Sequence, residues 1–201
     1  MDRIQYSPTN ATIVSIDPGT VCLGVGLLDF DVQTFKLVSA DAFTIDANKL
    51  QSNEHTGQLY GSRQQRIDAL SDYIYFEVLQ KIQPFGFACE SPFFNPLRPN
   101  AYVALVETLS AIRQTYRYYT DRKPMYLIDP PTVKKAIGVK QIKGEKTKEA
   151  VLRAMLAHPE LSAKTIKPIE EYDEHSLDAL AVGYTLLNEY LHGTFNLKVN
   201  L

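Results

Sequence analysis

Three acidic residues stand where apolar stretches of the chain end or are interrupted. Asp17 follows the apolar run 12–16, and Glu90 ends the run 85–89. Asp178 breaks the apolar side of a helical pattern. Carboxylates gathered from separate elements repel one another unless protons or divalent cations neutralise them. We therefore expect the three side chains to meet within a few ångströms of a shared pair of cations, a set that predicts Mg²⁺-dependent cleavage of phosphodiesters.

A histidine accompanies the third carboxylate. His175 lies three residues before Asp178, so a helix presents both on one face. It can share a metal with Asp178, or it can orient or activate a water. A plainer alternative is an exposed histidine near a helix start, where Asp173 and Glu174 suit the helix dipole. Both alternatives stay open at this point.

Positive charge is concentrated in one part of the chain. Ten Lys and Arg residues face only three acidic residues between 113 and 148, so this segment carries +7. The net charge of −2 leaves about −9 for the remainder. Basic side chains beside an acidic centre suit a metal-dependent nuclease, because they hold the phosphates of the substrate. The alternative is a solvated surface without function.

Length and composition indicate one globular domain over residues 1–201. We expect a polar leader at about 1–10 and a short tail at about 192–201. No run approaches the ~18 apolar residues of a membrane span, and the start is unlike a secretory signal. Cys22 and Cys89 lie in apolar runs, which favours free thiols over a zinc site. The expected location is therefore the cytoplasm, or the host cytoplasm of a virus, without secretion or membrane contact.

Apolar periodicity predicts the elements that position these residues. Strands are expected at 11–17, 21–29, 33–43, 85–90 and 124–128, with a tight turn near 30–32 between the second and third. Helices are expected at 63–82, 102–118, 132–137, 147–157 and 174–191. Residues 46–62 and the stretch before residue 174 are polar and are expected to be loops.

The string Ile16-Asp17-Pro18-Gly19-Thr20 before Gly24 and Gly26 has two known uses. It resembles the first carboxylate motif of ribonuclease-H-like nucleases, and also the phosphate loop of the sugar-kinase, actin and Hsp70-like ATPases. The second use calls for a later Asp-x-Gly-type motif and a second domain, and the chain has neither. The nuclease interpretation is the one that accounts for Glu90 and Asp178 as well.

Taken together, the motifs resemble the RuvC family of Holliday-junction resolvases, from about residue 12 to about residue 190. The first motif is followed by Phe87-Ala88-Cys89-Glu90, which is similar to the strand that carries the family's glutamate. The stretch 132–138 with 145–148 is similar to the family's basic active-site region, and 175–181 to its last motif. The position of His175 is aspartate in many members and histidine in some. The acidic balance of the chain is a departure, since well-known members are more basic.

The resemblance implies a ribonuclease-H-like five-stranded mixed sheet flanked by helices. It implies that Asp17, Glu90 and Asp178, with His175, bind two Mg²⁺ ions, for which Mn²⁺ would substitute. Lys134 and Lys146 would approach the cut phosphate, with Lys148 competing for the second role. The residues expected to contact DNA are Phe93, which would stack on a base, Arg98, Lys135, Lys143 and Lys148.

The function implied is an endodeoxyribonuclease that resolves four-way junctions by paired nicks in DNA recombination and repair. A homodimer through the helix at 102–118 would supply one site per strand. Two alternatives remain: a broader branched-DNA or flap nuclease of the same superfamily, and a catalytically silent DNA-binding module.

Overall fold

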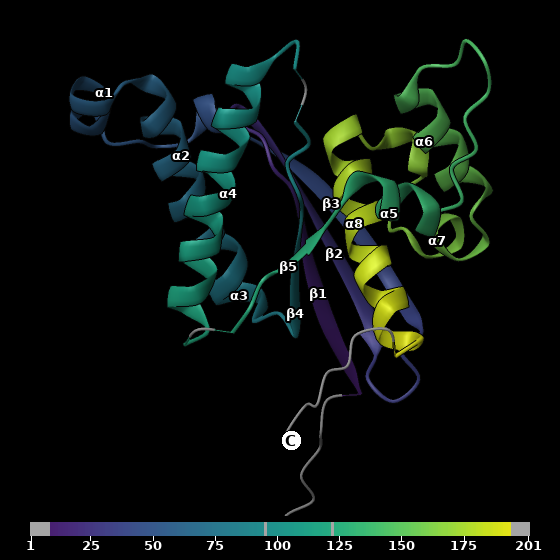
Figure 1. Ribbon diagram of the computed structural model, residues 1–201. Helices are drawn as coiled ribbons and strands as arrows, with labels where there is room; N and C mark the ends of the chain where they lie inside the picture. Colours follow the sequence, from purple (N-terminus) through teal and green to yellow (C-terminus); the bar gives the residue numbers. More distant parts are fainter. Residues whose placement is uncertain (1–8, 95, 122, 194–201) are drawn as a thin grey trace, which may run out of the picture.

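A five-stranded mixed sheet forms the centre of the computed structural model, which describes residues 9–94, 96–121 and 123–193 (Figure 1). The expected leader and tail lie largely outside this range. The strands run in the order β3-β2-β1-β4-β5. Their bounds are Asn10–Asp17 (β1), Cys22–Asp31 (β2), Leu37–Asp46 (β3), Gly86–Glu90 (β4) and Tyr126–Ile128 (β5). Antiparallel pairing joins β1, β2 and β3, and parallel pairing joins β1, β4 and β5, so the expected mixed sheet is confirmed.

The turn between β2 and β3 lies at residues 32–36, later than the expected position near 30–32. The Asp31 carboxylate accepts hydrogen bonds from the backbone N–H groups of Gln33 and Thr34, and Phe35 takes a positive φ of 53°. An aspartate that binds the backbone two and three residues ahead favours a turn that starts at the aspartate. β2 therefore ends at Asp31, later than the expected 29, and β3 spans Leu37–Asp46 in place of the expected 33–43.

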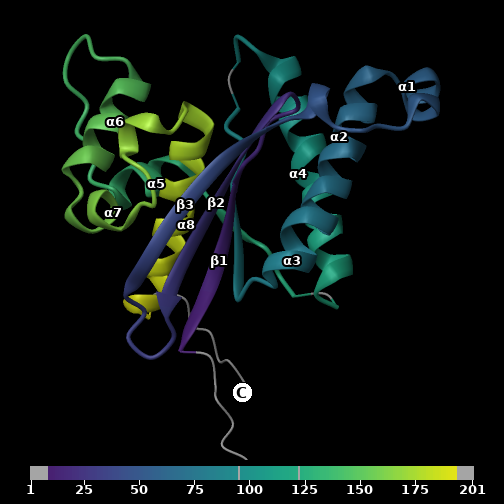
Figure 2. The same ribbon diagram turned by 180° about the vertical axis from the view of Figure 1, so that it is seen from behind.

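Helices cover both faces of the sheet (Figures 1 and 2). One layer consists of α2 (Ser62–Tyr73), a π-helical segment (Ile74–Leu79), α3 (Gln80–Ile82) and α4 (Pro99–Tyr119). The other consists of α5 (Pro130–Ala136), α6 (Thr147–Ala157), α7 (Pro159–Lys164) and α8 (Glu174–Leu191). The bounds of α6 and α8 match the sequence prediction. None of the described helices is both long and apolar enough to cross a membrane.

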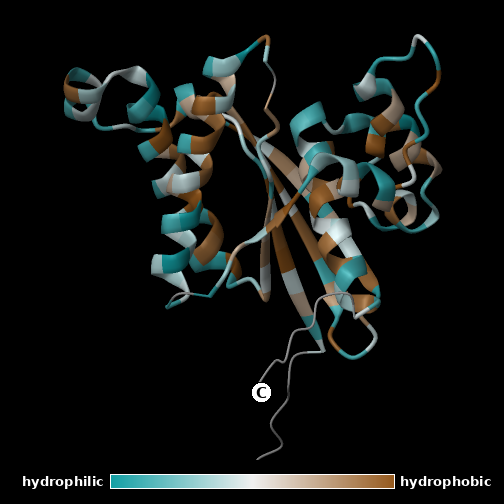
Figure 3. Ribbon diagram, in the orientation of Figure 1, coloured by the Kyte–Doolittle hydropathy of each residue, from teal (hydrophilic) through white to brown (hydrophobic). Residues whose placement is uncertain are grey.

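Each face of the sheet has its own apolar core. Val14, Ile16 and Phe87 pack toward the layer of α2 and α4. Ile13 and Ala88 point the opposite way and pack among residues of α8. This alternation follows from the period of two along a strand. Figure 3 shows the result, with hydrophobic residues along the strands and hydrophilic residues on the outer sides of the helices.

Two segments expected to be loops contain short helices. Residues 46–62 include a 3₁₀ turn at Ala47–Lys49 and helix α1 at Glu54–Tyr60. The stretch before α8 includes α7 and a 3₁₀ turn at Ile169–Glu171. Side chains of Asp46, Asn53 and His158 accept hydrogen bonds from the first turns of these elements. Because α1 buries none of its residues, it has no apolar stripe that periodicity detects.

Candidate active site

Asp17 and Glu90 end neighbouring parallel strands at the same edge of the sheet. The register pairs Ile16 of β1 with Cys89 of β4, so the next residues, Asp17 and Glu90, stand side by side. Parallel strands are about 4.8 Å apart. Both side chains lie on the same face as Ser15 and Ala88, which is the face covered by α8. Two carboxylates therefore point into one layer from adjacent strand ends.

Helix α8 packs closely against this face and brings two more polar side chains. Ser15 donates a hydrogen bond of 2.7 Å from its Oγ to the carbonyl oxygen of Ala179. Gly24 permits the close approach, because a Cβ there would lie 2.1 Å from the carbonyl oxygen of His175. The glycine in the first sequence motif thus sets the position of His175 and Asp178 above the strand ends.

Asp17 and His175 are joined by a hydrogen bond of 2.7 Å between Oδ2 and Nδ1. Burial raises the pKa of Asp17, and the bond to His175 opposes this rise only in part. The same bond raises the pKa of His175, against the effect of burial. A proton is therefore held between the two side chains, and the exposed-histidine alternative is wrong.

The charge of Asp17 changes the pKa of the other two carboxylates. Burial and then the charge of Asp17 raise the pKa of Glu90 to about 8. Burial and the same charge raise the pKa of Asp178 to about 6. The charge of Asp178 also contributes to the rise at Glu90. The three carboxylates expected from the sequence thus form one electrostatically coupled group, in which each destabilises the charge of the others.

The side chains of this group are of the types that bind divalent cations, but they do not converge on one point in this structure. Within the described ranges, no three His, Cys, Asp or Glu side chains form a ready-made metal-binding group. One oxygen of Asp17 is engaged by His175. Carboxylate oxygens are the ligands that Mg²⁺ and Mn²⁺ prefer, and a divalent charge would relieve the repulsion that raises these pKa values. The donor set therefore suits such ions, once the side chains turn toward a common point.

One lysine of the basic segment reaches the acidic group. Lys134 lies in the last turn of α5, is half-buried, and its charge lowers the pKa of both Glu90 and Asp178 against the other effects. α5 begins at Asp129, whose carboxylate accepts a hydrogen bond from the backbone N–H of Thr132. This cap fixes the start of α5 directly after β5 and thereby aims Lys134 at the acids.

The other lysines of the basic segment differ in their surroundings. Lys135 and Lys143 are exposed, and Lys146 is an exposed residue at the start of α6. Lys148 forms an ion pair with Glu174, the residue before His175. Of the two candidates for the second catalytic lysine, Lys148 is thus already engaged beside the site.

The loop after β4 carries the candidate DNA-stacking residue. Phe93 is 71% exposed, so the alternative of core packing with Phe94 is wrong. Phe94 instead packs edge-on against Tyr102 of α4, with ring centroids 5.3 Å apart. Arg98 is exposed at the start of α4. Figure 1 shows this loop and the basic loop before α6 rising from the same end of the molecule.

Two contacts at the site were not predicted. Arg66 of α2 donates a hydrogen bond of 3.1 Å from Nε to the carbonyl oxygen of Thr20, and so ties the loop after Asp17 to the opposite helical layer. Glu174 binds Lys148 and also lies 3.7 Å from Nε2 of His175. The Arg66–Thr20 and Lys148–Glu174 contacts have no local sequence signal, because each joins residues far apart in the chain.

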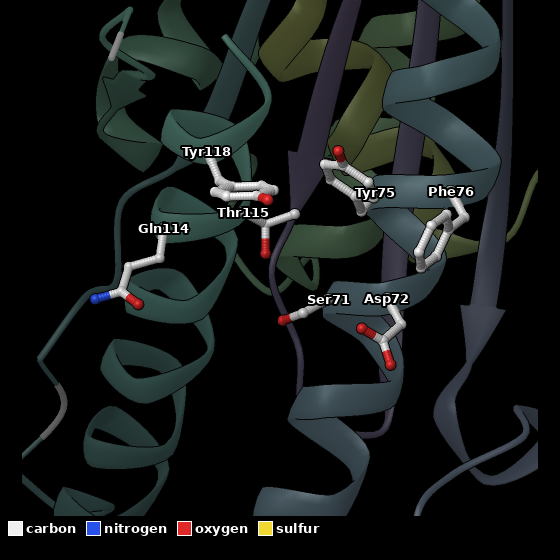
Figure 4. Close-up of a pocket in the computed structure, with 7 residues that line it drawn as sticks. All are labelled: Ser71, Asp72, Tyr75, Phe76, Gln114, Thr115 and Tyr118. Carbon is white, nitrogen blue, oxygen red and sulfur yellow. The ribbon is translucent and has the colours of Figure 1, made fainter. Parts of the chain in front are cut away.

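A separate pocket of about 430 Å³ lies between the π-helical segment and α4 (Figure 4). The ring of Tyr75 lies between those of Phe76 and Tyr118, with ring centroids 5.0 and 5.9 Å away. Among the described residues that line it, Asp72 is the one ionisable carboxylate or amine. With a lone carboxylate and no basic side chain in this described lining, the pocket does not offer the chemistry of the acidic edge.

Comparison with known proteins places the chain by its fold. No family model matches it, and no curated protein matches it in sequence. Among solved structures, RuvC of T. thermophilus in complex with a Holliday-junction substrate matches with 20% identity and a TM-score of 0.63. The match covers 91% of this chain and 97% of that one. A second Thermus thermophilus RuvC structure has 22% identity, a TM-score of 0.62 and the same coverage.

The yeast mitochondrial Holliday-junction resolvase matches with 12% identity and a TM-score of 0.58, over 94% of this chain and 83% of that one. The expected ribonuclease-H-like fold is therefore confirmed, and the chain is similar in structure to the RuvC resolvases over nearly its full length.

Proposed function

We propose that this chain, which has the fold of the RuvC resolvases, is a divalent-metal-dependent endodeoxyribonuclease that resolves four-way DNA junctions by paired nicks. The observation that carries the proposal is the coupling of Asp17, Glu90 and Asp178 at one edge of the sheet, with Lys134 beside them. A module that only binds DNA has no use for three partly buried carboxylates that repel phosphate. The silent DNA-binding alternative is therefore disfavoured.

The chain's own residues take distinct parts in the cut. Asp17, Glu90 and Asp178 would hold the cations through carboxylate oxygens, with His175 as a nitrogen donor at their side. Divalent cations at such a site polarise the phosphate and lower the pKa of a bound water. Lys134 approaches Glu90 and Asp178 and stabilises the negative charge that builds on the phosphate during attack. His175 keeps Asp17 oriented by the hydrogen bond through Nδ1.

The direct test is cleavage of a synthetic four-way junction, compared with three-way, flap and linear DNA of equal arm length. We expect paired nicks in the four-way junction with Mg²⁺ or Mn²⁺, none with a chelator, and little cutting of linear duplex. The nicks should be sealed by DNA ligase, which requires 5′-phosphate and 3′-hydroxyl ends. Equal cutting of flaps and junctions would favour the broader branched-DNA nuclease, and no cutting of any substrate would reject the proposal.

Lys134→Ala should slow the cut by roughly 10²-fold at saturating DNA and metal, as expected for loss of one cationic group that stabilises the transition state. Lys135→Ala is the matched control. Lys135 is the exposed neighbour of Lys134 on the same helix. Its loss should weaken DNA binding at moderate salt without a comparable loss of the single-turnover rate. The two rates, measured in single-turnover assays, should therefore separate. Equal losses in both variants would remove Lys134 from the proposed role.

Paired nicks need two sites, so the proposal includes a homodimer with α4 at its interface. Apolar side chains exposed on α4 support this part of the proposal, in particular Val103, which is 47% exposed, and Val106. Exposed apolar residues gathered on one helix are typical of interfaces.

The two cysteines without a disulfide agree with a reducing compartment, such as the cytoplasm of a cell or of a virus host.

A further inference from the structure

A narrow recess opens between α6 and α8, directly beside Asp178. We call it the α6–α8 slot. Its volume is about 200 Å³. Its walls are mainly apolar, and its rim carries charged side chains. The residues that matter below are Val151, Leu152 and Leu177 on the walls, and Lys148, Glu174 and Asp178 at the rim.

The ion pair between Lys148 and Glu174 joins the two helices at this rim. The Lys148 side chain is 66% exposed and that of Glu174 is 42% exposed. Exposed pairs of this kind are weak, so the contact opens at little cost when better partners arrive. When the pair opens, the Lys148 ammonium is free to bind a DNA phosphate, and the Glu174 carboxylate is free to accept a hydrogen bond.

Size and surface indicate what the slot can hold. Pockets for drug-sized ligands start at about 300 Å³, so the volume of about 200 Å³ suits a single planar nucleobase, whose sugar and phosphate would stay outside the slot. Apolar walls match the two faces of a nucleobase. Carboxylates at the rim accept hydrogen bonds from exocyclic amines, as acidic side chains do from the amino group of cytosine. Thymine has no such amine and would leave the Glu174 carboxylate unpaired.

We propose that the α6–α8 slot takes one unstacked, amine-bearing nucleobase of the strand being cut, with Glu174 accepting from the amine and Lys148 moving to an adjacent phosphate. This inference rests on the proposed nuclease function and adds to it a determinant of sequence preference. It also explains why a carboxylate that weakens phosphate binding stands next to His175.

The test uses a set of four-way junctions that differ only in the base at each of the three positions on either side of the cut. At one position, the protein should cut a junction with an amine-bearing base roughly ten-fold faster than one with thymine. Glu174→Gln should reduce this preference to below about three-fold, since the amide competes as a donor. Glu170→Gln removes an exposed charge outside the slot and should leave the preference unchanged.

A second measurement does not depend on cutting. 2-Aminopurine, an amine-bearing fluorescent base, placed at the preferred position should brighten when the junction binds, because it leaves the base stack. Leu152→Phe fills the slot and should abolish the increase while junction binding persists. Circular dichroism and thermal melting establish that the variant is folded.

The outcomes separate the two ideas. A protein that cuts junctions without preference between thymine and the other bases would overturn the slot and leave the nuclease function in place. Preference and fluorescence that survive in both Glu174→Gln and Leu152→Phe would overturn it as well. A protein that cuts no junction would overturn the nuclease function and the slot together.

Discussion

Asp17→Asn should abolish junction cutting, with a loss of at least about 10³-fold, while junction binding remains. Asp17 is the group on which the other carboxylates depend, because its charge acts on both Glu90 and Asp178 and its Oδ2 binds His175. Asparagine keeps the volume and a hydrogen-bonding oxygen but loses the charge that holds a cation. Removing one negative charge near the phosphate path should leave DNA binding equal or slightly stronger.

Single-turnover cutting and electrophoretic mobility shift with Ca²⁺ in place of Mg²⁺ would measure the two effects separately. Asp72→Asn is the matched control, since Asp72 is a carboxylate at the separate aromatic pocket and should leave the rate unchanged. Undiminished cutting by Asp17→Asn would remove the acidic edge from the reaction.

The parts of the fold that periodicity and caps specify were predictable from the sequence. The bounds of α8 were predicted because its buried residues recur at helical spacing, and the structure adds that Asp173 caps its first turn. β1 and β4 were predicted because apolar runs end at Asp17 and Glu90. Their meeting at one sheet edge follows from parallel pairing, which a sequence without a family resemblance does not specify.

The remaining features depend on contacts between distant parts of the chain. The bond from Arg66 to Thr20 and the pair of Lys148 with Glu174 join residues 46 and 26 positions apart. The π-helical segment keeps the apolar spacing of the helix around it, so the pattern predicts one uninterrupted helix. The bond between His175 and Asp17 also required coordinates, because the helix pattern was equally consistent with an exposed histidine.

The repulsion among the three carboxylates, which suits the site to cations, should also lower the stability of the folded protein. Glu90→Gln should therefore stabilise the protein at pH 8 by roughly 2–4 kcal/mol, or at least about 5 °C in thermal unfolding. Glu90 has an ordinary pKa of 4.5, and in the folded protein burial and then the charge of Asp17 raise this pKa to about 8. Below pH 4.5 the carboxyl is protonated in both states, so wild type and variant should be equally stable.

As the pH rises from 4.5 to about 8, the unfolded chain loses the Glu90 proton more readily than the folded protein. The wild type therefore loses stability across this window, whereas the variant does not titrate at residue 90. Urea unfolding at pH 5 and pH 8 would measure the difference. Glu77→Gln, at an exposed residue paired with Lys81, is the control and should change stability by less than about 0.5 kcal/mol.

Divalent cations should reduce the difference in stability between the wild type and Glu90→Gln at pH 8, because they should stabilise the wild type more. A ligand that binds only the folded state stabilises it more the tighter it binds, and the wild type keeps the carboxylate that the variant lacks. Titration with Mg²⁺ at pH 8 should accordingly raise the melting temperature of the wild type more than that of Glu90→Gln. Equal stability of the two proteins at pH 8 would mean that Glu90 is solvated rather than buried beside Asp17. A difference in stability that Mg²⁺ leaves unchanged would mean that Glu90 does not contribute to cation binding.

Because stability and cutting are measured independently, the gain in stability on losing Glu90 and the loss of cutting together test whether the acidic edge lowers stability in favour of catalysis.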